Sequence, residues 1–185
     1  MPDFPTFDHW FPPDLPPERR PAPAYALRRP SEGDLAALQG RLRDWLEEAG
    51  IPGPGHTWTR HVAGTSWIAE DDTDGRALGV LLGFTSPDHP EEAVIKGIAV
   101  DPELRRRGIG RALVARFTLE QAQIGATRLS AACRPDDRRA LAFFGALGFA
   151  PNAGPGSRKL YGVPAFESWD GPGEDRVLLE RVISP

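Results

Sequence analysis

Residues 98–114 read IAVDPELRRRGIGRALV, and this stretch decides the fold prediction. An apolar strand ends at Val100, a turn with the pattern RxxGxG follows, and a helical apolar period starts at Ile109. Gly108 and Gly110 lack a Cβ, so we expect unusual backbone dihedrals in the turn and close approach of a ligand to the main chain. The first amides of a helix have no acceptor within it, and the helix dipole favours an anion there. The sequence therefore predicts a diphosphate-binding turn at the carboxyl end of a strand.

Other glycine-rich patterns fit this stretch less well. An isolated GxG pair is also typical of a tight turn that binds nothing. The dinucleotide-binding fingerprint needs a third glycine where this chain has Leu113, and its strand usually comes early in the fold. The Walker pattern GxxxxGK[ST] is absent from the sequence. A tight turn without a ligand and a helix start that binds phosphate without either fingerprint both stay open at this point.

The segments around this turn alternate between strand and helix patterns. Upstream we expect a short strand from Ala24, a helix over about 34–49 with the capping pair Ser31 and Asp34, a loop over 52–64, and a hairpin of strands 66–70 and 77–85. Downstream we expect a strand over 93–100, a helix ending at Gly125, a strand over 128–133, a helix over about 136–147, and final strands over 159–162 and 176–183. The strand–helix–strand order after residue 93 predicts a right-handed crossover between parallel strands, as in an α/β fold.

Composition describes an ordinary globular protein. The chain has 185 residues, 40% of them hydrophobic and 26% charged, with a net charge of −4, which does not favour a nucleic-acid partner. The longest apolar run, residues 77–84, is too short for a membrane-spanning helix, and no signal peptide is recognised, so we expect a cytoplasmic location. Cys133 is the only cysteine, and His56 and His61 are too sparse for a metal site, so neither a disulfide nor a bound metal is expected.

Residues 1–23 form a proline-rich N-terminal arm, and residues 24–185 form the predicted domain. Repeated prolines prevent a lasting helix or inner strand in the arm. Its aromatic residues, Phe4, Phe7, Trp10 and Phe11, are unusual for a plain tail. The arm is therefore expected either to dock on its own domain or a neighbouring subunit, as in a homodimer, or to be a partly disordered tail.

Two motifs together resemble the GNAT N-acetyltransferase superfamily. The first is Ile98-Ala99-Val100 followed by 105–111, RRRGIGR, and the second is Asp137, Ala140, Phe143, Phe144, Gly148 and Phe149, which resembles NxxAxxFY…GF. The resemblance covers about residues 24–183. It implies a single-domain α/β fold with a mixed, twisted sheet of about six to seven strands and helices on both faces. The cofactor-binding residues that it implies are Ile98, Ala99, Val100, Arg105, Arg106, Arg107, Gly108, Ile109, Gly110, Arg111, Asp137 and Phe144.

The resemblance also implies an activity, transfer of an acetyl or similar short acyl group from acetyl-CoA to a primary amine. By the family pattern, the main chain of Ile98 and Val100 pairs with pantetheine, and amides of 106–111 hold the pyrophosphate. A neutral amine attacks the thioester directly, so a base or water chain is needed. A main-chain amide of this strand, freed by a bulge, stabilises the oxyanion. The acceptor would be a small molecule or a peptide.

Three positions depart from the family pattern. Phe144 stands where a tyrosine usually protonates the CoA sulfur, Asp137 replaces the motif's asparagine, and Val94 replaces the glutamate base of some relatives. Glu92 is the nearest carboxylate on the same strand face and is the candidate base, although a solvated surface role is the alternative. Tyr161 is the candidate acid on a neighbouring strand, or else a half-buried structural residue.

These departures leave other functions open. A chain without acid and base is compatible with a sensor that binds acyl-CoA with little or no turnover. An interaction protein organised around the N-terminal arm is a further alternative. The acceptor cannot be read from the sequence, although Trp58 in the irregular loop is a candidate wall of its pocket.

Overall fold

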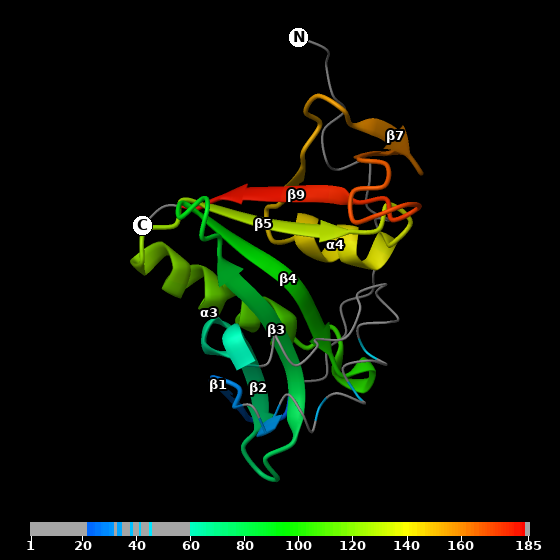
Figure 1. Ribbon diagram of the computed structural model, residues 1–185. Helices are drawn as coiled ribbons and strands as arrows, with labels where there is room; N and C mark the ends of the chain where they lie inside the picture. The colour runs from blue at the N-terminus through cyan, green and yellow to red at the C-terminus, as the bar shows by residue number, and fades with distance from the viewer. Residues whose placement is uncertain are drawn as a thin grey trace. The chain divides into compact units, whose positions relative to one another are not determined.

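The computed structural model describes residues 22–31, 33, 34, 38, 41, 45 and 60–183. Its strands are β1 (Tyr25–Arg28), β2 (Trp67–Asp71), β3 (Ala77–Thr85), β4 (Glu92–Val100), β5 (Arg128–Cys133), β6 (Ala150–Pro151), β7 (Arg158–Leu160), β8 (Val163–Ala165) and β9 (Val177–Val182). Its helices are α3 (Ile109–Gln123) and α4 (Arg138–Gly145), with 3-10 turns η2 (Ala63–Thr65) and η3 (Pro102–Leu104) (Figure 1).

Seven strands form one sheet in the order β1-β2-β3-β4-β5-β9-β6, and β7 pairs with β8 separately. The pairs from β1 to β4 are antiparallel. β4 and β5 are joined through α3, and the first residue of β5 donates its amide to the carbonyl of Glu91 just before β4. Neighbouring strands that start together run in the same direction, so the sheet is mixed, as predicted.

The chain divides into two compact units. The N-terminal unit contains the described residues up to Leu129 together with Val182 and Ile183, and the C-terminal unit contains Ser130–Arg181. Each unit is described by itself below. The arm over 1–23 lies outside the described residues except for Ala22 and Pro23.

One face of the sheet in the N-terminal unit carries helical residues from before β2. Residues 33, 34, 38, 41 and 45 have helical backbone, which agrees with the predicted first helix at every described position. Leu38 and Trp45 belong to a buried cluster whose other members are Ala63, Ile68, Val80, Leu82 and Ala99. The apolar stripe of the first helix is therefore buried where it is described, as its period predicts.

The opposite face of the same strands is covered by α3, which runs along them in Figure 1. Ile109, Leu113 and Phe117 are fully buried on this helix. They lie against two glycines of β3, because a Cβ on Gly79 would come within 3.2–3.3 Å of Ile109 and Leu113. The glycines let the helix lie close to the sheet and fix the place where α3 begins.

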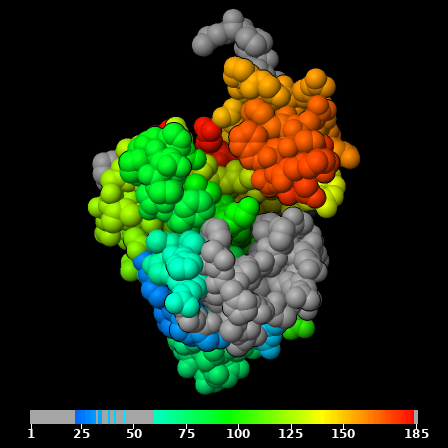
Figure 2. Space-filling view, viewed as in Figure 1, coloured from blue at the N-terminus to red at the C-terminus, as the bar shows by residue number. Residues whose placement is uncertain are grey.

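The C-terminal unit contains α4, most of β9 and the β7–β8 hairpin. Leu141 and Phe144 of α4 are buried, as are Val177 and Leu179 of β9. Residues 158–175 are coloured orange in Figure 2, where much of this segment faces solvent. Among the described residues, no helix is long and apolar enough to cross a membrane.

Candidate functional site

The turn between β4 and α3 has two residues with left-handed backbone. After η3 the chain is extended at Arg105 (φ −59°, ψ 154°), and then φ is +66° at Arg106 and +88° at Gly108. Gly108 therefore needs to be glycine, as predicted, because other residues rarely adopt this conformation. Gly110 does not share the unusual dihedrals expected for it, since it is the second residue of the regular helix.

The first amides of α3 lack a partner within the helix and follow an exposed glycine. The hydrogen-bond ladder of α3 begins with the Ala112 N–H donating to the Gly108 carbonyl at 2.9 Å, so the amides of 109–111 have no acceptor within the helix. Gly108 is exposed, and no described atom lies within 4 Å of a Cβ placed on it. The first turn of α3 contains no acidic residue. This geometry and charge fit a diphosphate.

Two of the three consecutive arginines brace the turn rather than extend from it. The Nε of Arg105 donates to the Val100 carbonyl at 3.2 Å, and Nη2 of Arg107 donates to the Glu103 carbonyl at 3.1 Å. Arg106 between them is exposed. Because these guanidinium groups bond to carbonyl oxygens, they help to fix the direction in which the turn's amides point.

The end of β4 carries the strand residues predicted to contact the cofactor. Ile98 pairs with Leu81 and Val100 with Gly79 of β3, while the Ala99 side chain is in the buried cluster on the other face. The register shifts where Leu82 pairs with Gly97 and Gly83 with Ile95, which leaves Lys96 as an extra residue. A bulge is thus present in the strand, two residues before Ile98.

Glu92 lies at the start of β4 and is held by an ion pair. Its Oε2 accepts a hydrogen bond from Nη2 of Arg128 at 2.7 Å. Six residues separate Glu92 from Ile98, which corresponds to about 20 Å along a strand. The ion pair with Arg128 and the distance from Ile98 do not favour the predicted role of Glu92 as a base.

Asp137 and Phe144 belong to the C-terminal unit. Asp137 caps α4, since its Oδ1 accepts from the Ala140 N–H at 2.9 Å, as expected for the motif position. Phe144 is 5% exposed, and its ring packs edge-on against Phe143 and Phe149 at centroid distances of 5.3 and 5.1 Å. Both residues therefore have a structural role within this unit.

Tyr161 is placed differently from its prediction. It does not lie on a strand and is not half-buried: it forms the two-residue turn of the β7–β8 hairpin with Gly162 and is 66% exposed. Its φ is +47° and that of Gly162 is +92°, as in a type I′ turn. Nη2 of Arg138 donates to its carbonyl at 3.1 Å. Tyr161 is thus largely exposed at a hairpin tip.

Only some of the other aromatic and histidine residues considered for a site lie within the described residues. Trp58 and His56 lie outside the described residues, and His61 is exposed. Trp67 is buried, with the guanidinium groups of Arg29 and Arg116 over its ring at 4.1 and 4.5 Å. No group of three His, Cys, Asp or Glu side chains that could hold a metal is found among the described residues.

Sequence reasoning missed Asp101, which joins β4 to the turn. Its Oδ1 accepts from the Glu103 N–H at 3.0 Å and so caps η3, whose first residue is Pro102. The signal was present, because Asp followed by Pro is a common start of a helical turn. The left-handed conformation of Arg106 had no such signal.

Comparison with known families identifies the class of protein. The model of the Acetyltransferase (GNAT) family matches residues 10–149, so this chain belongs to the GNAT acetyltransferase family. The chain is 32% identical over 122 residues to the L-2,4-diaminobutyric acid acetyltransferase of Nocardia farcinica, covering 65% of this chain and 62% of that protein. It is 30% identical over 122 residues to the enzyme of the same name from Streptomyces coelicolor, covering 65% and 70%. The chain thus spans less than two thirds of the Nocardia protein.

Solved structures show the same fold. The diaminobutyrate acetyltransferase from Paenibacillus lautus, in complex with L-2,4-diaminobutyric acid and coenzyme A, has a TM-score of 0.64 and 20% identity, covering 86% of this chain and 95% of that one. A phosphinothricin acetyltransferase from Sinorhizobium meliloti in complex with acetyl-CoA has a TM-score of 0.64 and 19% identity, covering 86% and 89%. The predicted mixed sheet with helices is confirmed by these neighbours.

Proposed function

We propose that this protein is an N-acetyltransferase that moves an acetyl group from acetyl-CoA to a primary amine. The observation that carries the proposal is the start of α3. There the amides of 109–111 follow two residues with left-handed backbone, and the first turn of the helix contains no acidic residue. In the sequence, this region resembles the family's acyl-CoA motif. Its amides would bind the CoA diphosphate, and the main chain of Ile98 and Val100 would bind pantetheine.

The reaction needs little covalent help from the protein. A neutral amine nitrogen attacks the thioester carbonyl, the C–S bond breaks, and the thiolate of CoA leaves and takes up a proton. An alkylammonium with a pKa of about 10.4 must first be deprotonated. The sequence candidates for these steps are Glu92 as base and Tyr161 as acid. The ion pair of Glu92 and the exposed hairpin position of Tyr161 favour water as the base and solvent as the acid instead. Glu92→Gln and Tyr161→Phe test the two side chains, because each should lower kcat at least tenfold if it transfers a proton in the reaction.

The acceptor is proposed to be a small diamino acid of the size of L-2,4-diaminobutyrate. The support is that two curated relatives at 32% and 30% identity carry this acceptor in their names. The test is a panel of L-2,4-diaminobutyrate, L-ornithine, 1,3-diaminopropane and a short peptide with acetyl-CoA, with free thiol and acetylated product both measured. Turnover with the diamino acid above the rate without acceptor is expected. Turnover with the peptide alone would contradict the acceptor assignment.

A binding protein without turnover is the second candidate. The observation that favours it is the buried Phe144, which puts no hydroxyl at the position where the family motif has a tyrosine. Calorimetric titration with CoA, followed by the amine panel on the same sample, separates the two. Binding without thiol release in any reaction would support the sensor.

Location and assembly are further parts of the proposal. Use of acetyl-CoA as cosubstrate supports a cytoplasmic location. Homodimerisation is proposed from the aromatic residues of the N-terminal arm. Light scattering on the full chain and on a chain lacking residues 1–23 tests this, and a monomer in both samples would overturn it.

A further inference from the structure

Asp101 follows β4 at the base of the candidate diphosphate turn and is bonded to β3, to η3 and to Arg76. Its amide donates to the Leu78 carbonyl of β3 at 2.9 Å, and its carbonyl accepts from the Leu104 N–H at 2.8 Å. Its Oδ1 caps η3 through the Glu103 N–H, and its Oδ2 faces Nη1 of Arg76 at 3.2 Å. The side chain is 12% exposed, so its charge is largely removed from water at the point where the turn leaves the sheet.

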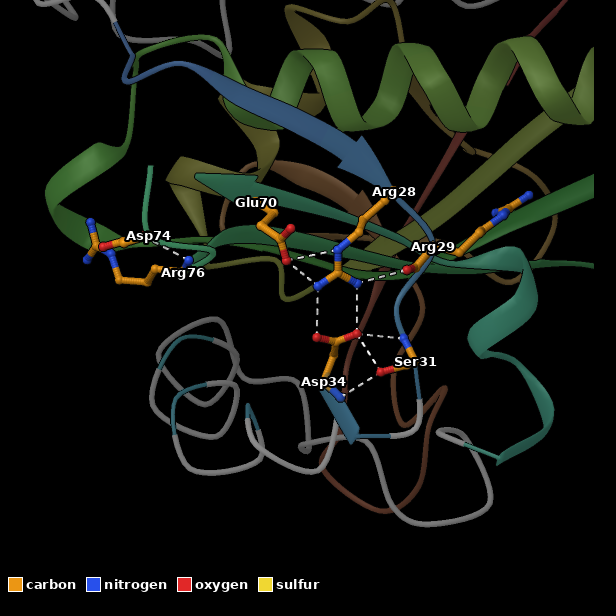
Figure 3. A network of polar contacts seen from close by, with 7 residues as sticks. All are labelled: Arg28, Arg29, Ser31, Asp34, Glu70, Asp74 and Arg76. Atoms are coloured by element: carbon orange, nitrogen blue, oxygen red, sulfur yellow. Dashed lines mark hydrogen bonds and ion pairs between the residues drawn. The ribbon is translucent and has the colours of Figure 1, made fainter. Parts of the chain in front are cut away.

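Arg76 comes from the turn that joins β2 to β3, which is far from Asp101 in sequence. The backbone of Arg76 is fixed, because its N–H donates to Asp74 Oδ1 at 2.9 Å and its carbonyl accepts from the Asp71 N–H at 2.9 Å (Figure 3). The hairpin tip, residues 72–75, is exposed and lies at the bottom of the view in Figure 2. The guanidinium thus reaches from a hydrogen-bonded hairpin to the start of the candidate diphosphate turn.

The turn needs such support from outside. Left-handed backbone at Arg106, which is not a glycine, is a strained conformation that persists only where the surroundings fix it. Amides that bind an anion must also be held in place before the ligand arrives, since small displacements weaken binding strongly. Within the turn, the braces are the bonds from Arg105 and Arg107 to carbonyl oxygens. At its base, the brace is Asp101.

We infer that Asp101 and Arg76 form a positioning pair that holds the turn of residues 102–108 in the conformation that binds the CoA diphosphate. The inference rests on the proposed function, because it assumes that acetyl-CoA is the ligand. Neither residue touches the ligand: Asp101 acts by fixing the backbone, and Arg76 acts through Asp101. Arg76 is 38% exposed, and ion pairs of this kind contribute little to folding stability, so its loss should be seen mainly in ligand affinity.

The first test is Arg76→Ala with CoA binding measured by calorimetry and unfolding measured by thermal melting. We expect the Kd to rise about fivefold to tenfold with a melting temperature within about 2 °C of the wild type. Arg76→Lys should restore most of the affinity. Arg158→Ala is the matched control, since it removes an exposed arginine that pairs with Glu167 at 3.3 Å in the C-terminal unit, and it should leave the Kd unchanged.

A double-mutant cycle tests that the two residues act together. Asp101→Asn keeps an oxygen for the cap on η3 but removes the charge that faces Arg76. If the pair acts as a unit, the double variant Arg76→Ala/Asp101→Asn should have a Kd for CoA no higher than that of whichever single variant binds CoA less tightly. Additive losses would contradict a shared role.

A truncated acyl donor separates positioning from general damage. S-acetylpantetheine has the thioester but no diphosphate, so Arg76→Ala should lower kcat/KM for acetyl-CoA about fivefold and leave that for S-acetylpantetheine unchanged. Equal losses for both donors, or an unchanged Kd for CoA, would overturn the inference. Failure of the wild type to bind CoA would instead overturn the proposed function, so the two failures are distinguishable.

Discussion

Gly83 of β3 lies against the ring of Phe117 on α3 so closely that a Cβ there would stand 2.7 Å from two ring carbons and 3.0 Å from the Val94 carbonyl oxygen. Phe117 is fully buried, so its ring packs against the protein interior. The close approach lets α3 lie against the sheet, and the candidate diphosphate turn is attached to the start of that helix.

Gly83→Ala should destabilise the protein by about 1–3 kcal/mol, because the added methyl overpacks a rigid core. Chemical denaturation monitored by tryptophan fluorescence measures the change. Gly64→Ala is the control, since a Cβ there meets no described atom within 4 Å, and it should change stability by less than about 0.5 kcal/mol. Equal effects of the two substitutions would show that the Phe117 contact is not the cause.

Gly110→Glu should abolish measurable CoA binding. The carboxylate would stand in the first turn of α3, where it would repel the diphosphate and crowd the main chain. Ala115→Glu is the matched control, because it adds the same charge at an exposed position further along the helix. Calorimetry should show no heat of CoA binding for Gly110→Glu and wild-type affinity for Ala115→Glu. Wild-type affinity in both variants would contradict a diphosphate site at the start of α3.

Phe144→Tyr should keep the fold and raise kcat about tenfold if protonation of the CoA sulfur limits the rate. The ring is packed edge-on between Phe143 and Phe149, so the added hydroxyl must find space at the edge of this cluster. Initial rates across pH 6–10 with the best acceptor measure the effect. An unchanged kcat together with an unchanged Kd for CoA would mean that a different step limits turnover.

Folding stability should fall in acid through Asp34. Its carboxylate accepts hydrogen bonds from Arg28 at 2.7 and 2.9 Å and from Ser31, and these bonds, led by Arg28, hold the pKa of Asp34 well below its usual range (Figure 3). A lowered pKa in the folded state stabilises the protein above the unfolded value near pH ~4, and this stability is lost as the pH falls further. Glu70 holds the same Arg28 from β2.

Urea denaturation at pH 3 to 7 tests this, with Asp34→Asn beside the wild type. The wild type should lose stability below about pH 4 more steeply than the variant, because the variant has no carboxylate to protonate. Parallel pH curves for the two proteins would rule out Asp34 as the source.

Cys133 should not react in the folded protein. Burial, followed by the charge of Asp137, raises the pKa of its thiol to about 12. With 5,5′-dithiobis(2-nitrobenzoic acid) at pH 8 we expect no reaction within minutes, and one thiol per chain after unfolding in guanidinium chloride. Rapid labelling of the native protein would contradict the described burial, and it would also interfere with assays of CoA release.

The sequence predicted those parts of the fold that depend on local patterns. The strands over 77–85 and 128–133 and the start of α3 at Ile109 lie where their apolar periods place them. The hairpin tip at Tyr161 was missed because type I′ turns usually carry Asn or Asp before glycine, and a tyrosine hides the signal. Of the predicted strand 159–162, only Lys159 and Leu160 lie on β7, and Tyr161 and Gly162 form the turn that precedes β8.

Long-range pairings could not be read from local patterns. Nothing in the sequence links Arg76 to Asp101 or Glu92 to Arg128, since 25 and 36 positions separate the partners. The left-handed φ of Arg106 was also invisible, because it is imposed by the turn's surroundings and not by the residue type. The glycine turn and the helix start after it were predictable from a local pattern, whereas acid and base roles depend on how distant side chains meet.

The most direct test of the central claim is a titration of ¹⁵N-labelled protein with CoA, followed by amide NMR. The account predicts that the largest shifts are those of Gly108, Ile109, Gly110 and Arg111, saturating together as the site fills. Absence of shifts at these amides with millimolar CoA, or saturating shifts confined to other parts of the chain, would contradict it.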